Sequence, residues 1–223
     1  MKTIGSTIIM LALASSLFAD NGKELKLASP DGTHEIVFYQ KQVSPAVNEL
    51  CYRVDYKSQP VVNESRAGLE LDNRIWEMAL GVRNLKQPAC WMDNLEVDSV
   101  TYQPETNLTW QPLYGERSSV RDHYRAGTLC LSKKDNSGYR LNIEVRAYNE
   151  GVAFRYFFPE HPKAIFHKVV GDLTEYALPA GTKAWTEQWA QAFFERLNID
   201  DIKHPVERAL TFELPNGKWA ALA

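Results

Sequence analysis

The chain has 223 residues, of which 44% are hydrophobic and 11% aromatic, so it can bury the core of one large β domain or of two small domains. Its net charge of -3 is close to neutral and no basic stripe runs along it, which argues against nucleic acid as a partner. Six Trp, ten Tyr and nine Phe are many for this length, and we expect most of these rings to be in the core, although sugar-binding β surfaces are also rich in aromatic residues.

Residues 1–19 have the pattern of a secretory signal peptide. Lys2 supplies the positive start, residues 8–14 form a short apolar run, and Ala19 is a small residue suited to cleavage. The run is too short to span a bilayer comfortably. We therefore expect a mature chain that begins at Asp20, has no membrane span, and is exported to the periplasm or the outer surface.

The first half of the chain predicts a series of strands. Pro30-Asp31-Gly32 is a strong turn signal and predicts a hairpin. Asp72 and Asn73 are cap candidates for a short helix. The predicted strands or extended pieces are 25–27, 35–39, 50–56, 60–71, 97–111 and 129–132, and the predicted helix is 74–80.

The stretch Arg146–Pro159, together with the residues ahead of it, is the most regular part of the sequence. Apolar and polar residues alternate over 139–148 and again over 152–158, and Asn149-Glu150-Gly151 supplies turn residues between them. This predicts a β-hairpin near the middle of an antiparallel sheet, with a glycine able to take a positive φ. Arg155 lies between two aromatic residues, and we favour an exposed or cross-strand-paired arginine over one held against a ligand or a partner domain.

The second half continues with short strands. We expect a strand over 174–178, a mixed segment over 184–198, and a hairpin of 209–214 with 218–222 around Asn216-Gly217. The sequence stops at Ala223 inside an apparent strand, which suggests a truncation; the alternative is a natural terminal strand docked in a sheet. Many short strands at regular spacing predict an all-β sandwich or barrel.

The cysteines and histidines indicate neither a definite disulfide nor a metal site. Cys51, Cys90 and Cys130 are an odd number, so one disulfide and three free thiols remain equally open. The five histidines are scattered, without the spacing of a zinc site.

Four stretches resemble the N-terminal domain of glycoside hydrolase family 97, a family of exported α-glucosidases and α-galactosidases known mainly from Bacteroidetes. Residues 146–156 resemble the family's Arg-x-Tyr-Asn-x-Gly-Val-Ala-Phe-Arg-Tyr core in register, and residues 110–124 resemble its Trp…Tyr-Gly-Glu-x-Ser block. Residues 27–32 resemble the first hairpin of the family. Residues 65–69 resemble a Ser-x-Leu-Gly-Leu piece, with Ala67 in place of the usual leucine.

The resemblance implies that residues 20–223 form a β-supersandwich of two large antiparallel sheets with short helical pieces. In the family this domain packs on a (β/α)8 barrel that carries the catalytic carboxylates. Glycoside hydrolysis needs a pair of carboxylates on the two sides of the scissile bond, and no stretch here resembles that pair. We therefore expect no catalytic residue in the chain, which ends before the barrel and should not hydrolyse sugars alone.

The resemblance also implies one contribution to a calcium site of the complete enzyme. The segment from Ala184 to Glu195 resembles the family segment that ends in a calcium-binding glutamate, so Glu195 is the candidate ligand and Glu187 the second choice. Calcium prefers about six to eight oxygen ligands, so a site shared between two domains is chemically sensible and one carboxylate is not enough.

The resemblance implies, more weakly, a second set of site residues that reach the sugar. Arg208, Ala209 and Leu210 occupy the place of a family segment that reaches the sugar, with Ala209 where a proline is usual. An ordinary strand start is the alternative reading of these residues.

Three functions are compatible with the sequence. The first is the non-catalytic, carbohydrate-binding-type N-terminal domain of an exported α-glycosidase, which completes the calcium and α-linked oligosaccharide site of the barrel. The second is a stand-alone β-sandwich that binds carbohydrate on exposed rings such as Trp185 and Trp189. The third is a domain that only stabilises a barrel.

Overall fold

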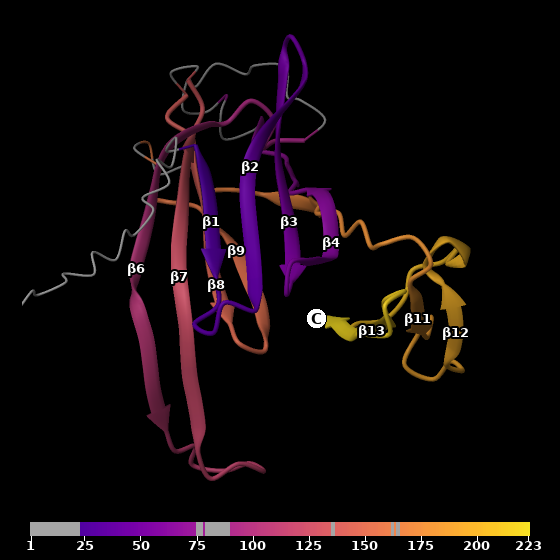
Figure 1. The fold of residues 1–223 in the computed structure, drawn as a ribbon. Helices are drawn as coiled ribbons and strands as arrows, with labels where there is room; N and C mark the ends of the chain where they lie inside the picture. The colour runs from indigo at the N-terminus through magenta and orange to yellow at the C-terminus, as the bar shows by residue number, and fades with distance from the viewer. Residues whose placement is uncertain (1–22, 75–77, 79–89, 135–136, 162, 164–165) are drawn as a thin grey trace, which may run out of the picture.

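The computed structural model describes residues 23–74, 78, 90–134, 137–161, 163 and 166–223, and they form a nearly all-β protein (Figure 1). The predicted signal peptide and most of the predicted helix over 74–80 lie outside the described residues. The elements are β1 (Glu24–Ala28), β2 (His34–Ser44), β3 (Val47–Tyr56), β4 (Gln59–Arg66), β5 (Leu69–Leu71), β6 (Glu96–Trp110), β7 (Val120–Ser132), β8 (Arg140–Tyr148), β9 (Gly151–Phe157), β10 (Val169–Asp172), β11 (Lys183–Thr186), β12 (Glu195–Asn198), the 3-10 helix η1 (Ile199–Asp201), β13 (Leu210–Glu213) and β14 (Trp219–Leu222).

Two four-stranded antiparallel sheets pack face to face and form the sandwich. One has the order β1-β2-β3-β4 and the other the order β6-β7-β8-β9. Between them the ring of Phe38 lies 5.3 Å from that of Tyr52 and 5.1 Å from that of Phe154, while Leu141 and Ile143 are fully buried. Alternating apolar side chains thus point inward from both sheets, which confirms the predicted all-β sandwich.

The first hairpin forms where its turn residues predict. Strands β1 and β2 pair from Glu24 with Tyr39 to Ala28 with Glu35. Gly32 takes a φ of 73°, and the carboxylate of Asp31 accepts hydrogen bonds from the backbone N–H and hydroxyl of Thr33 at 2.9 and 2.8 Å. A positive φ is readily available to glycine, which is why the chain can reverse here.

The predicted hairpin of Arg146–Pro159 is confirmed as β8 and β9, but its place in the sheet differs from the prediction. Strand β9 is the edge of the order β6-β7-β8-β9 and not a middle strand. Gly151 pairs with Tyr148 as the first residue of β9, and the turn needs no positive φ there. Arg155 is exposed and pairs with Glu144 across the hairpin at 2.6 Å, which confirms the prediction of an exposed or cross-strand-paired arginine.

Strands β6 and β7 extend beyond the sandwich as a two-stranded arm. Strand β8 pairs with β7 only between Tyr124 and Ser132, while the β6–β7 ladder continues to the pair of Trp110 with Val120 (Figure 1). The strand predicted over 129–132 is therefore only the end of a longer strand, β7, which begins at Val120. The loop at the end of the arm carries Leu113 and Tyr114, both almost fully exposed.

The chain then leaves the sandwich along an irregular segment. The strand predicted over 174–178 is not formed: the backbone N–H of Glu175 donates to Arg66 O and that of Asn63 to Ala177 O, but the N–H of Ala177 donates to the hydroxyl of Ser65. The Ser65 side chain thereby replaces a backbone partner and interrupts the ladder. Upstream, β10 pairs with β5 in a small two-stranded sheet.

A four-stranded C-terminal sheet, ordered β12-β11-β13-β14, stands beside the sandwich (Figure 1). The hairpin of β13 and β14 turns at Asn216-Gly217 as predicted, with a Gly217 φ of 76°. Its own buried cluster is Ala184, Phe212 and Leu214. This smaller sheet is additional to the two sheets of the sandwich.

Cys51, Cys90 and Cys130 are all free thiols, which settles the question that the sequence left open. Burial raises the pKa of the Cys51 thiol to about 11, and nearby Glu64 and Glu49 act in the same direction. Across the residues given above, no helix has the length and apolar character needed to cross a membrane.

Candidate functional site

Glu187 and Glu195, the two predicted calcium ligands, line the same groove on the C-terminal sheet. This glutamate groove has a volume of about 460 Å³ and is lined by residues 186–189, 191–193, 195, 197, 201–204 and 206. Asp201 and His204 also line it, so several groups able to bind cations or hydroxyls share one concave surface.

The pairing of β11 with β12 positions the two glutamates. Thr186 is the register partner of Glu195, and its hydroxyl donates to the Glu195 carbonyl at 3.3 Å. Glu187 follows directly, and its carbonyl accepts a hydrogen bond from the Glu207 backbone at 2.9 Å. The loop between the strands is thereby fixed at both ends, with Glu195 at the start of β12.

Exposed aromatic side chains lie beside the glutamates. Trp189 is 56% exposed, Phe193 94% and Phe194 71%. Trp189 and Phe193 line the groove itself. Large rings that are this exposed and this close together are typical of a surface that another molecule or domain covers.

The described residues of the groove do not form a metal site on their own. Among the described residues, no group of three or more His, Cys, Asp or Glu is arranged to hold a metal ion. Calcium takes about six to eight oxygen ligands, so Glu195 fits the role of a single ligand contributed to a shared site and does not fit a complete site.

The weaker candidates, Arg208, Ala209 and Leu210, lie outside this groove. Leu210 begins β13, pairs with Leu222 and packs on the small buried cluster. Arg208 is exposed and acts electrostatically on Tyr176: burial raises the pKa of that phenol, and the positive charge of Arg208 lowers it. None of the three lines the glutamate groove, and none lines the second cavity described next.

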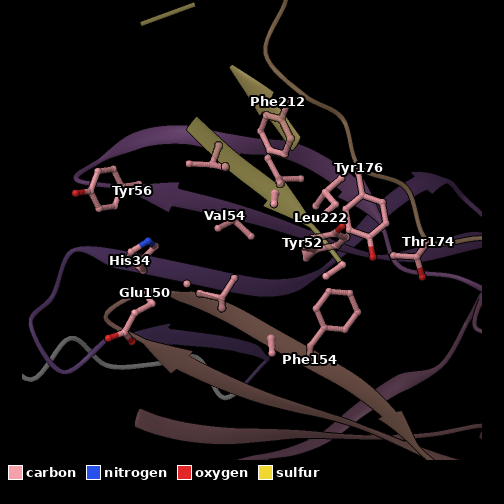
Figure 2. Close-up of a pocket in the computed structure, with 18 of the residues that line it drawn as sticks. His34, Tyr52, Val54, Tyr56, Glu150, Phe154, Thr174, Tyr176, Phe212 and Leu222 are labelled. Carbon is pink, nitrogen blue, oxygen red and sulfur yellow. The ribbon is translucent and has the colours of Figure 1, made fainter. Parts of the chain in front are cut away.

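That second cavity lies between the sandwich and the C-terminal sheet, and we call it the junction cavity. Its volume is about 790 Å³. Figure 2 shows His34 and Phe154 of the sandwich and Phe212 and Leu222 of the C-terminal sheet pointing into it. Sequence reasoning missed it, because it forms only where two distant parts of the chain meet.

The aromatic pair suggested for a sugar platform, Trp185 with Trp189, is not the pair that the structure stacks. Trp185 instead stacks on Trp219 of β14, with ring centroids 4.4 Å apart and an interplanar angle of 31°. Trp219 lines the junction cavity, whereas Trp189 lines the glutamate groove. The Asn216-Gly217 turn indicates only that β14 lies beside β13, and it does not indicate that Trp219 reaches Trp185.

Comparison with known proteins identifies the family of the chain. The family model described as "Glycosyl-hydrolase 97 N-terminal" matches residues 27–223. A retaining alpha-galactosidase from Bacteroides thetaiotaomicron is 26% identical over 178 residues, which cover 80% of this chain and 22% of the relative.

Solved structures show the same fold. A glycoside hydrolase family 97 enzyme from Pseudoalteromonas sp. strain K8, in complex with panose, superposes with a TM-score of 0.71 at 24% identity over 86% of this chain and 27% of the enzyme. A beta-arabinopyranosidase superposes with a TM-score of 0.68 at 16% identity, over 88% of this chain and 31% of that protein. The chain thus spans about a quarter of the length of these proteins, and the match over nearly all its described residues shows that it belongs to the glycosyl-hydrolase 97 N-terminal family.

Proposed function

We propose that the chain is the non-catalytic N-terminal domain of an exported α-glycoside hydrolase, and that it packs on a (β/α)8 barrel and contributes Glu195 to a calcium and sugar site there. Membership of the family and the small share of the relatives' length that the chain covers support this proposal. Export rests on the signal-peptide pattern of residues 1–19.

The observation that carries the proposal is the glutamate groove. Glu195, at the start of β12, lines the same groove as Glu187 and the exposed rings of Trp189 and Phe193, and exposed Phe194 precedes it in the chain. Burial of those rings against a barrel would remove apolar surface from water at roughly 25 cal/mol per Å². The same contact would bring Glu195 next to ligands that this chain lacks.

The test is a chimera in which this chain replaces the matching N-terminal segment of the Bacteroides thetaiotaomicron alpha-galactosidase. Isothermal titration with calcium is compared for the unsubstituted chimera, Glu195→Gln and Glu187→Gln. We expect Glu195→Gln to weaken calcium binding by about tenfold or more, and Glu187→Gln to leave it within about twofold.

The isolated chain is the matched control and should not bind calcium measurably at submillimolar concentration, because it offers too few ligands. Equal losses in the two chimera variants, or no loss in either, would refute the role of Glu195.

A further inference from the structure

The arm formed by β6 and β7 continues the two faces of its sheet beyond the end of the sandwich (Figure 1). Successive residues of a strand point to opposite faces, and directly paired residues share a face. Within the sandwich, Leu129 and Leu131 of β7 are fully buried and face the other sheet, while Thr128 faces outward. The β7–β8 ladder has no register shift and the β6–β7 pairs over 106–110 are one-to-one, so the alternation of β7 continues unbroken into the arm.

The inner face of the arm, which continues the core-facing side of the sheet, is polar and is held by contacts within the arm. Arg121, His123 and Arg125 lie on this face. The Glu105 carboxylate lies 2.7 Å from Nε2 of His123 and accepts a hydrogen bond from Nε of Arg125 at 3.0 Å. Nε of Arg121 donates to the side-chain carbonyl of Asn107 at 3.0 Å. The side that is apolar inside the sandwich is therefore polar in the arm.

The outer face of the arm has the opposite character. On this face Leu108 pairs with Asp122 and Trp110 pairs with Val120. Leu108 is 64% exposed and Trp110 is 53% exposed, while Val120 is half-buried. The apolar and polar sides of β7 thus exchange places beyond the end of β8, and the apolar side of the arm faces away from the core of its own sandwich.

Large side chains mark both ends of this outer face. At its base, the Tyr124 ring lies 5.1 Å from that of Tyr148, and the guanidinium of Arg146 lies 4.4 Å from the Tyr124 ring centre. At the tip of the arm, Leu113 is fully exposed and Tyr114 is 90% exposed. A two-stranded ribbon is only marginally stable alone in water, and exposed apolar side chains that gather on one surface mark a contact with another protein or domain.

The size of the face argues for a partner domain in the same polypeptide. Even a large aromatic side chain buries only about 150–250 Å². The exposed side chains at 108, 110, 113 and 114 therefore supply less than the roughly 800 Å² per partner that a stable dimer needs. A linked domain is present at high effective concentration and can pack on a smaller surface. This chain covers 22% of the alpha-galactosidase and 27% of the family 97 enzyme, so most of each relative is such linked chain.

We propose that the outer face of the arm, with Leu108, Trp110, Leu113 and Tyr114, is a docking surface for the catalytic domain of the complete enzyme. This inference rests on the proposed function, because it requires the barrel named there. None of these four residues lines the glutamate groove, so the arm is a second contact, separate from the one that brings Glu195 to the barrel. Two separate contacts restrict the rotation of one domain on another more than a single contact does.

The test is hydroxyl-radical footprinting of the isolated chain and of the chimera described above, read for each residue by mass spectrometry. The radical oxidises aromatic and aliphatic side chains faster the more they are exposed. We expect the oxidation of Trp110, Leu113 and Tyr114 to be at least about fivefold slower in the chimera. Tyr102 is the matched control, because it is 51% exposed on β6 but pairs with Gly127 on the inner face, and its oxidation should change less than about twofold.

The rings of the glutamate groove distinguish a failure of this inference from a failure of the proposed function. If Trp189 and Phe193 become protected in the chimera while the outer face of the arm stays exposed, the docking role of the arm is overturned and the proposed function stands. If neither set of side chains becomes protected in the chimera, both are overturned.

A charge on the outer face sharpens the test. In the chimera, Leu108→Glu should restore the oxidation of Trp110, whereas Thr109→Glu, one residue along on the inner face, should not. In the isolated chain Leu108→Glu should change the unfolding temperature by less than about 2 °C, because it alters only an exposed side chain. A larger loss there would assign Leu108 to the stability of the arm itself and overturn the proposal.

Sedimentation of the isolated chain needs no chimera. We expect a monomer with and without Leu108→Glu, because the face is too small to hold a second copy. A discrete dimer that Leu108→Glu dissociates would make a second copy of this chain the occupant and would overturn the proposal.

Discussion

The sandwich and the C-terminal sheet differ in how much of their own surface they bury. In the sandwich, large side chains such as Phe38, Tyr52 and Ile143 are almost completely removed from water. The C-terminal sheet has Ala184, Phe212 and Leu214 as its buried cluster within the described part of the chain. Since burial of apolar area is the main stabilising term, the two regions should differ in stability.

The two regions also differ in the side chains that they expose. The sandwich places alternating polar residues on its outer face, such as Glu144 and Arg155. The C-terminal sheet instead carries exposed Trp189, Phe193 and Phe194 beside the glutamate groove. The β6–β7 arm also exposes large apolar side chains, such as Leu108 and Leu113, so exposed apolar groups do not by themselves separate the two regions. We conclude from its smaller buried cluster that the C-terminal sheet is the region that depends more on contact with another domain or ligand.

The largest effect should come from the sandwich core. Ile143→Ala removes a fully buried side chain between the two sheets, and we expect it to lower the free energy of unfolding by about 2–5 kcal/mol. Urea denaturation followed by circular dichroism measures this loss. A loss well under 1 kcal/mol would show that the core is less tightly packed than its burial indicates.

Phe212→Ala should destabilise the C-terminal sheet alone and so increase the difference in stability between it and the sandwich. Phe212 is the largest member of the small cluster, so its removal should open the C-terminal sheet while the sandwich stays folded. Limited proteolysis should then cut within residues 186–218 at least about tenfold faster, with little change in the main thermal transition. If the whole protein unfolded at a lower temperature to the same extent, the two regions would be one cooperative unit.

Acid should weaken the sandwich through His167. Burial, assisted by the nearby His161, lowers the pKa of His167 from the ordinary 6.5 to about 4, and its ring stacks on Phe158 at 4.3 Å. Between these two values the unfolded chain binds a proton that the folded chain does not, so stability is complete above 6.5 and falls as the pH drops toward 4.

Thermal unfolding measured at several pH values checks this dependence. His167→Phe keeps a ring against Phe158 and should flatten the curve between the two pKa values. An identical slope in the variant would assign the dependence to other groups.

The smallest effect is expected for Arg155→Ala. The Arg155–Glu144 pair is solvent-exposed, and such pairs contribute about 0–1 kcal/mol. Chemical denaturation of this variant, beside Glu144→Ala, measures the pair. A loss of several kcal/mol in one variant alone would mean that Arg155 has a second, buried partner.

Local sequence patterns predicted most of the sandwich. Alternation over 139–148 predicted which side chains of β8 are buried, and Asp31-Gly32 and Asn216-Gly217 predicted two turns that the structure confirms. These features depend on neighbours in sequence. The edge position of β9 and the loss of the strand at 174–178 depend on distant partners, namely the order of the sheet and the hydroxyl of Ser65.

The candidate sites also combine features that local sequence predicts with features that depend on distant residues. Glu187 and Glu195 lie close together because adjacent strands of one hairpin hold them, so the sequence predicted their neighbourhood. The stacking of Trp219 on Trp185 joins residues far apart in the chain, and no local pattern predicts it. For the same reason the junction cavity could not be predicted from the sequence.

The most direct test of the contrast is native-state hydrogen exchange of the isolated chain, resolved by residue. We predict that amides of β11, β12, β13 and β14 exchange through local openings of markedly lower free energy than amides of β2, β3, β7 and β8, whose protection should approach that of global unfolding. Equal protection in the two sets would contradict the account, because the C-terminal sheet would then be as complete on its own as the sandwich.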